Sequence, residues 1–139
     1  MRIRIRTEDS LQWVCAKDKK LTDEQLKKYG DGELTSKVRI REEGSETLPQ
    51  LIEIQYEPNA EIQIHAHDED EIIFVREGEM HLGNRVVGPG TSVFVAGNTL
   101  YGFKAGPQGL QILNFRPRKD ITFISPAEFA ARKHEVKAS

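Results

Sequence analysis

The sequence offers almost no thiol chemistry, because it contains a single cysteine, Cys15. One cysteine excludes an internal disulfide, and it excludes a zinc site built from several thiolates. The longest aliphatic or aromatic run is residues 72–75 (IIFV), far short of the roughly 20 residues that cross a bilayer. The first ten residues, MRIRIRTEDS, lack the apolar stretch of a secretion signal. We therefore expect a cytoplasmic protein without a membrane partner.

Neither sign of charge dominates the sequence. The 20 basic and 22 acidic residues give a formal net charge of -2, and they are mixed along the chain. Interspersed charges of both signs are typical of a solvated surface, and they do not favour nucleic acid as a partner. The length of 139 residues, 37% of them hydrophobic, predicts one domain with one core.

Turn-forming residues divide the middle of the chain into short segments with strand character. These segments are residues 38–40, 51–56, 62–67, 72–75, 80–82, 86–87, 92–95, 100–103 and 110–115. Glycine, proline or asparagine recurs between them, for example at 77–78, 83–84, 88–90, 97–98 and 106–107. Many short strands separated by such turns predict an all-β antiparallel sandwich or barrel.

Helices are expected on both sides of the strand region. Residues 21–29 (LTDEQLKKY) read as a short helix with Thr22 as N-cap and Gly30 as its stop. A second helix is expected from about residue 126 to about 136, because Ser125 supplies a cap and a proline follows at the first helical position.

These elements divide the chain into three parts. Residues 1–33 form an N-terminal arm and helix that pack on the barrel, residues 34–118 form the barrel, and residues 119–139 form a helical tail. Within the arm, residues 3–6 alternate Ile with Arg, which predicts a short edge strand.

The strongest chemical signal lies in the segment HAHDEDE, residues 65–71. His65 and His67 are two positions apart, so on a strand their rings lie on one face at a spacing of about 6–7 Å. Glu71 follows after a polar turn and opens an apolar strand. Two imidazoles and one carboxylate suit Fe(II), Mn(II), Ni(II) or Zn(II), so we expect one such divalent ion. Gly78 lies six residues further on, where we expect a hairpin to turn.

The spacing HxHxxxE, six residues and glycine resembles the first signature of the cupin superfamily, with Asn59 in place of its opening glycine. Asparagine also tolerates positive φ. The stretch from Gly90 to Tyr101 resembles the second signature more loosely, with Ala96 for proline, Asn98 for glycine and Tyr101 for histidine. The resemblance implies a single RmlC-like cupin barrel, a double-stranded β-helix or jelly roll, with a short N-terminal and a C-terminal helix. It also implies a homodimer, for which residues 3–6 offer an exchangeable arm.

Tyr101 stands where metal-binding members of that superfamily usually carry their fourth protein ligand. A phenol has an ordinary pKa of about 10, which a metal ion would have to lower substantially. Three roles therefore stay open for Tyr101: a fourth ligand, a hydrogen-bond or proton donor to substrate, or a plain pocket residue in a site with weak or no metal. Tyr101 and Glu71 are the candidate catalytic residues.

Three further residues are expected in a substrate pocket, because each shares strand parity with a candidate residue. They are Gln63, Phe103 and Ile73. A rim position is the alternative for Gln63, and core packing is the alternative for Phe103. Arg116 could pair with a carboxylate substrate, but we interpret it chiefly as a solvated charge. His81 is expected on the surface, outside the site.

Three functions remain open at this point. The lead is a metal-dependent enzyme acting on a small oxygen-rich metabolite, with a dioxygenase as first choice because the ligand set leaves room for substrate and O2. The second is a non-enzymatic binder or sensor of a small ligand. The third is a metal-free isomerase or epimerase that uses Tyr101 and a histidine as acid and base.

Overall fold

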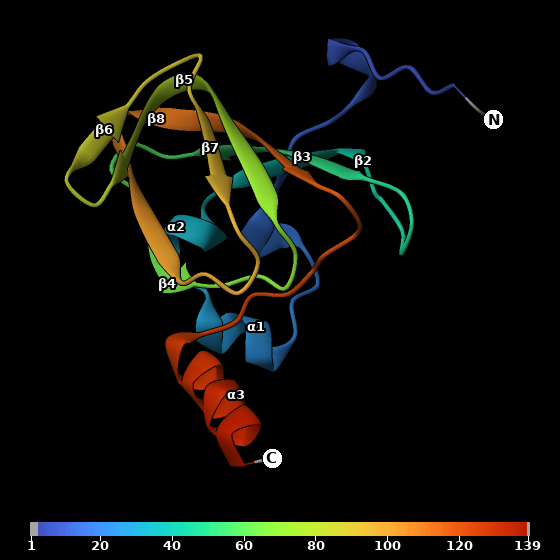
Figure 1. Cartoon of the computed structure of the whole chain (residues 1–139). Helices are drawn as coiled ribbons and strands as arrows, with labels where there is room; N and C mark the ends of the chain where they lie inside the picture. The colour runs from blue at the N-terminus through green and yellow to red at the C-terminus, as the bar shows by residue number, and fades with distance from the viewer. Residues whose placement is uncertain (1–2, 139) are drawn as a thin grey trace.

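The computed structural model describes residues 3–138, with side chains in the last helix up to Lys133. Eight strands form one antiparallel sheet at its centre (Figure 1). They are β1 (Val14–Cys15), β2 (Lys37–Glu42), β3 (Gln50–Tyr56), β4 (Glu61–His65), β5 (Glu71–Leu82), β6 (Arg85–Val87), β7 (Ser92–Val95) and β8 (Tyr101–Arg116). The helices are α1 (Asp23–Lys28), α2 (Asp31–Leu34) and α3 (Pro126–Ala138), with 3-10 turns at Glu8–Ser10 and Ala16–Asp18.

The long strands β5 and β8 organise the barrel. All strand pairs are antiparallel, and the second half of β8 lies between β3 and the first half of β5, which also pairs with β7. The first half of β8 pairs with β4 and with the end of β5, beside β6. The two ends of these bent strands thus contribute to two facing layers, and the predicted all-β jelly-roll barrel is confirmed (Figure 1).

Two predicted turns are wrong, because β5 and β8 each run through them. Residues 72–75 and 80–82 belong to one strand, as do residues 101–103 and 110–115. Gly78 does not turn a hairpin but occupies an irregular part of β5 with a φ of 78°. A Cβ at Gly78 would lie 2.0 Å from the carbonyl oxygen of Gly109, so the close approach of β5 to β8 requires glycine there.

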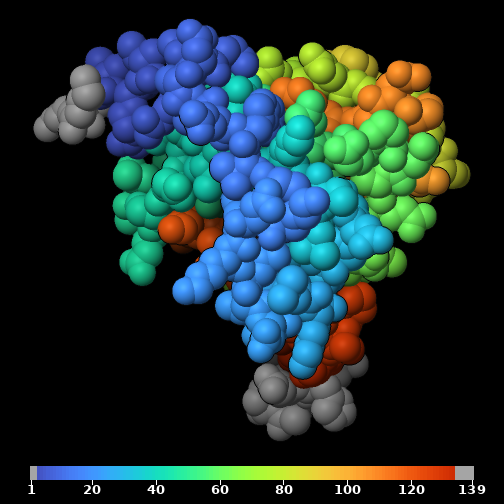
Figure 2. Space-filling model, turned by 180° about the vertical axis from the view of Figure 1, so that it is seen from behind, coloured from blue at the N-terminus to red at the C-terminus, as the bar shows by residue number. Residues whose placement is uncertain are grey.

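The predicted edge strand at residues 3–6 is also wrong. The segment has no strand pairing, and Ile3 and Ile5 are exposed. Its arginines contact β2 instead: the Arg4 guanidinium binds the Glu42 carboxylate, and Arg6 Nε donates to the Arg41 carbonyl at 3.0 Å. The segment is held by side chains and not by a backbone ladder. Figure 2 shows the N-terminal part of the chain running over the outside of the barrel.

The predicted helices are confirmed, with one addition. Thr22 caps α1 as expected, since its hydroxyl accepts from the Gln25 amide at 3.1 Å. Gly30 does not simply end that helix but caps α2, a four-residue helix too short to leave a pattern in the sequence. Ser125 caps α3, accepting from the Glu128 amide at 3.2 Å. No helix in the described residues has the length and apolarity needed to span a membrane.

Candidate functional site

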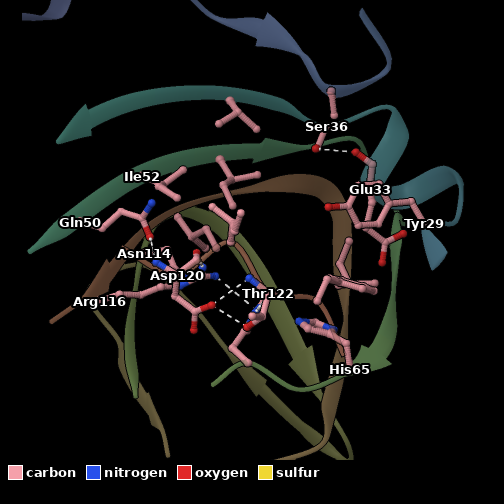
Figure 3. A pocket seen from close by; sticks show the side chains of 18 of the residues that line it. Tyr29, Glu33, Ser36, Gln50, Ile52, His65, Asn114, Arg116, Asp120 and Thr122 are labelled. Carbon is pink, nitrogen blue, oxygen red and sulfur yellow. Dashed lines mark hydrogen bonds between the residues drawn. The ribbon is translucent and has the colours of Figure 1, made fainter. Parts of the chain in front are cut away.

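The barrel contains a cavity of about 410 Å³, whose wall is largely apolar. The aliphatic strand residues that line it are Val38, Ile40, Ile52, Ile54, Ile62, Ile73 and Ile112. Its polar side chains lie in two groups (Figure 3). His65, Asn114, Arg116, Asp120 and Thr122 surround one end, and Tyr29, Glu33 and Ser36 lie beside α2. Helix α1 and the segment 119–125 meet beside that end, because the rings of Tyr29 and Phe123 contact edge to face at a centroid distance of 5.0 Å.

The two histidines are held with defined ring orientations. His65 Nδ1 lies 2.6 Å from the backbone carbonyl of Gln63, and His67 Nδ1 contacts the carbonyl of Thr122. A carbonyl only accepts hydrogen bonds, so each Nδ1 carries the proton and each Nε2 carries a lone pair. The rings are 4.8 Å apart between centroids, and His65 stacks on Phe123 at 4.3 Å.

Both imidazoles are neutral at pH 7. Burial lowers the pKa of His65 to about 4, although the Gln63 carbonyl partly opposes the change. Burial, and then the positive charge of Arg116, lower the pKa of His67. The site therefore presents uncharged nitrogen acceptors.

Glu71 opens β5 and is buried beneath the histidines. Its Oε1 accepts a hydrogen bond from the Tyr101 hydroxyl, and its Oε2 accepts from Asn114 Nδ2 at 2.8 Å. Burial, together with the nearby Glu71 charge, raises the pKa of Tyr101. Tyr101 is thus a protonated donor to Glu71, and not a phenolate positioned to bind a metal.

Arg116 lies in the site, which corrects its interpretation as a solvated charge. Its side chain is buried at the end of β8. One terminal nitrogen donates to the backbone carbonyl of Asp120, and the other lies 3.4 Å from Nε2 of His67 and 3.5 Å from Oε2 of Glu71. Strand alternation predicts this position of Arg116. Asn114 and Arg116 follow the buried Ile112 at intervals of two residues, so all three side chains lie on the same face of β8.

The segment after β8 completes the site through backbone groups that no sequence pattern reveals. The Asp120 carboxylate accepts from the amides of Thr122 and Glu69, at 2.8 Å each. These bonds fix the segment so that the Thr122 carbonyl meets His67 and the Asp120 carbonyl meets Arg116.

The side chains in this arrangement do not fit a metal centre with His65, His67 and Glu71 as ligands. The free Nε2 atoms suit a metal, but both Glu71 oxygens already accept hydrogen bonds. The Arg116 guanidinium lies where an ion bound to His67 Nε2 would sit, and two cations there would repel each other. Across the described residues, no group of three or more His, Cys, Asp or Glu side chains is placed to hold an ion. The divalent metal stays a prediction.

The other predicted site residues divide into two groups. Ile73 and Phe103 line the cavity, and Phe103 stacks with Tyr101 at a centroid distance of 6.2 Å. Gln63 does not line it, because an irregularity in β4 between Ile62 and His65 breaks the alternation and exposes Gln63 on the outer face. Only the Gln63 carbonyl serves the site.

Two substitutions in the signatures keep the expected backbone. Asn59 and Asn98 replace signature glycines, and both have positive φ, at 61° and 60°. His81 lies outside the site and pairs with Glu79 at 3.1 Å.

Comparison with solved structures identifies the architecture. The polyketide cyclase RemF from Streptomyces resistomycificus matches 96% of this chain and 94% of its own with a TM-score of 0.67 and 20% sequence identity. An RmlC-like cupin protein from Ralstonia eutropha matches 96% of this chain and 86% of its own, with a TM-score of 0.63 and 11% identity. A cupin-2 domain from Rhodospirillum rubrum matches 100% and 88%, with a TM-score of 0.61 and 14% identity. No protein-family model matches the sequence, and comparison with curated proteins gives no match. At these identities the likeness establishes the fold and leaves the activity to the site.

Proposed function

We propose that this chain, which has the fold of cupin proteins, is a small-molecule enzyme that transfers protons without a metal ion. The observation that carries the proposal is the buried guanidinium of Arg116 beside His67 and Glu71. It supplies, from the chain itself, a positive charge at the polar end of the cavity. The metal-free isomerase, third among the functions open from the sequence, thereby becomes the lead.

The cavity favours a flat, mostly apolar substrate with a carbonyl group at one end. Its wall is aliphatic, with the rings of Tyr56, Tyr101 and Phe103 among the lining groups. Sites of this kind use a few polar groups to orient an otherwise apolar ligand. A carbonyl compound that forms an enol fits, because its apolar body matches the wall and its oxygen matches the cation. RemF acts, as its name states, as a polyketide cyclase, and polyketides are carbonyl-rich.

His65 is the proposed proton acceptor. Its Nε2 carries a lone pair and has no hydrogen-bond partner among the described side chains. Taking a proton from the carbon next to the substrate carbonyl would leave an enolate and an imidazolium. The Glu71 charge raises the pKa of His65 and so stabilises the imidazolium. Arg116 would stabilise the enolate through its positive charge, since its side chain lines the polar end of the cavity.

Hydrogen–deuterium exchange of benzoylacetone tests the proposal. This aryl diketone is flat, apolar and acidic at the carbon between its carbonyls, and NMR in D2O with a chelator follows loss of the C–H signal. We expect the protein to accelerate exchange and His65→Gln to slow it by about a hundredfold, within the range of general-base effects. His81→Gln is the matched control, because that histidine lies outside the cavity.

The same assay distinguishes the other functions. Exchange that chelator abolishes and Fe(II), Mn(II), Ni(II) or Zn(II) restores would refute the metal-free mechanism and support the metal-dependent enzyme. Saturable binding of benzoylacetone without accelerated exchange would favour a binding module. Elemental analysis of protein purified without affinity metal gives an independent measure of bound ion.

A further inference from the structure

The polar side chains beside α2 form a second group in the cavity, which the proposed proton transfer does not use (Figure 3). Glu33 of α2 lines the cavity, and its oxygens accept from backbone amides, Oε1 from Gln63 at 2.7 Å and Oε2 from Gly30 at 2.8 Å. Helix α2 lies directly on β4, because a Cβ at Gly32 would be 2.1 Å from the carbonyl oxygen of Glu61. A carboxylate offers about four lone-pair sites, so the two amides leave acceptor capacity for a ligand.

The Tyr56 hydroxyl is a polar group without a partner in the same cavity. Tyr56 lines the cavity and is only 9% exposed. Its hydroxyl makes no hydrogen bond to the residues that the structure describes. Burial raises the pKa of Tyr56, and the charges of Glu33 and then Glu71 raise it further, so the hydroxyl lies within electrostatic reach of both carboxylates. Because buried tyrosine hydroxyls usually have a partner, a free one in a cavity indicates a ligand group that completes it.

A row of aromatic rings connects Tyr56 to the histidine end of the cavity. Tyr56 contacts Phe103 edge to face at a centroid distance of 5.5 Å, and Phe103 stacks with Tyr101. The Tyr101 ring in turn lies 4.7 Å from that of His65. All four rings line the cavity. A flat ligand with its carbonyl near His65 can therefore lie along this row and extend towards Tyr56 and Glu33.

A hydroxyl group is the ligand group that matches Glu33 and Tyr56 together. It can donate to a Glu33 oxygen and accept from the Tyr56 hydroxyl. An ammonium group has no lone pair for Tyr56, and a carboxylate would bring a second negative charge beside Glu33.

We propose that Glu33 and Tyr56 form a recognition site for a hydroxyl group, and that the substrate is a hydroxylated aromatic carbonyl compound. This inference rests on the proposed function, because it names the substrate class of the same cavity. It assigns binding roles to two residues that take no part in the proton transfer from carbon to His65.

Isothermal titration calorimetry at pH 7 with a chelator tests the site on the full chain with two ligands of nearly the same shape. They are para-hydroxybenzoylacetone and para-fluorobenzoylacetone, of which only the first can donate from the ring. The wild type should bind the hydroxyl compound at least about tenfold more tightly. Tyr56→Phe and Glu33→Gln should each reduce this ratio to about threefold or less. Thr35→Val is the matched control, because it removes a hydroxyl at the end of α2 that bonds the Asp31 carbonyl outside the cavity.

Circular dichroism confirms that each variant is folded before its affinities are interpreted. If Glu33→Gln does not fold, Tyr56→Phe alone decides, since the Tyr56 hydroxyl supports no bond within the protein. A wild-type ratio near one would overturn the inference, and so would no binding of either compound or a ratio that a folded variant of either residue retains.

The exchange assay evaluates the proposed function separately. Accelerated exchange of benzoylacetone without a hydroxyl preference would overturn the hydroxyl site and leave the proton transfer. A hydroxyl preference that both variants lose, without accelerated exchange, would support the hydroxyl site and refute the proton transfer.

Discussion

Replacing Glu53 with glutamine should lower the unfolding free energy at pH 7. It should also remove the part of that free energy that is lost as the pH becomes acidic. The Glu53 carboxylate is completely buried on the outer side of the sheet. It accepts from Arg39 Nε at 2.9 Å, Arg41 Nε at 2.6 Å, Arg76 Nη1 at 2.8 Å and Gln111 Nε2 at 2.9 Å. One negative charge thus binds three guanidinium groups.

The magnitude follows from the pKa of Glu53. Burial alone would raise it, but the hydrogen bonds from Arg39, Arg41 and Gln111 outweigh burial and lower the pKa from 4.5 to about 2. A difference of about 2.5 between the unfolded and folded values corresponds to roughly 3 kcal/mol of stability. Because the folded pKa is the lower one, this stabilisation is complete above pH 4.5 and disappears as the pH falls towards 2. Glu53→Gln also leaves buried guanidinium charge uncompensated, so we expect a loss of about 3–5 kcal/mol at pH 7.

Urea unfolding followed by circular dichroism at pH 7, pH 4.5 and pH 3 measures the effect. The difference in unfolding free energy between wild type and Glu53→Gln should shrink as the pH falls below 4.5. Glu42→Gln is the matched control, since Glu42 pairs with Arg4 at the surface and should matter far less. A difference for Glu53→Gln that is the same at pH 7 and pH 3 would refute the reasoning.

Four further substitutions have expected effects on unfolding free energy, measured by the same urea titrations at pH 7. Gly78→Ala should lower the unfolding free energy by about 3 kcal/mol or more, because its Cβ would overlap the backbone of β8. Gly83→Ala should lower it by only about 1–2 kcal/mol, because Gly83 has a φ of 62° but open space around it. Equal losses would contradict this. Thr22→Ala removes the cap of α1 and should cost about 1 kcal/mol; no loss would mean that the hydroxyl is replaced by water. Tyr101→Phe leaves a buried Glu71 oxygen without its donor and should cost about 1–3 kcal/mol; an unchanged value would contradict that bond.

The fold could be predicted from turn chemistry and alternation, but the length of the strands could not. Gly78 and the Gly106–Pro107 pair read as turns because glycine and proline usually punctuate strands. In the structure they mark places where β5 and β8 come too close for a side chain. A Cβ at Gly106 would lie 2.8 Å from Cβ of Glu79, and one at Gly78 would overlap Gly109. A glycine can form a turn, or it can allow a neighbouring strand to approach closely. Which of the two occurs depends on a residue about 30 positions away in sequence, and the local sequence pattern carries no information about that residue.

The candidate site, too, could be predicted only in the part that depends on residues close together in sequence. The signature spacing identifies His65, His67, Glu71 and Tyr101, which the structure brings together at one end of the cavity. The signature spacing contains no information about Arg116. The burial of Arg116 depends on two contacts, one with Glu71 of β5 and one with the backbone carbonyl of Asp120 in the segment after β8.

Arg116 changes what the signature residues can do. Beside a bound metal, a histidine pair and Glu71 would be ligands. Beside a guanidinium, Glu71 instead becomes the counter-charge of Arg116, and Tyr101 becomes its hydrogen-bond donor. Glu71 and Arg116 compensate each other, and the Asp120 carboxylate keeps its negative charge while it accepts from the amides of Thr122 and Glu69. With both imidazoles neutral, each charge in the buried polar end thus has a partner inside the protein. Such a site can remain stable in an apolar barrel without a metal ion. The site would have to accommodate one additional positive charge when a proton moves onto His65.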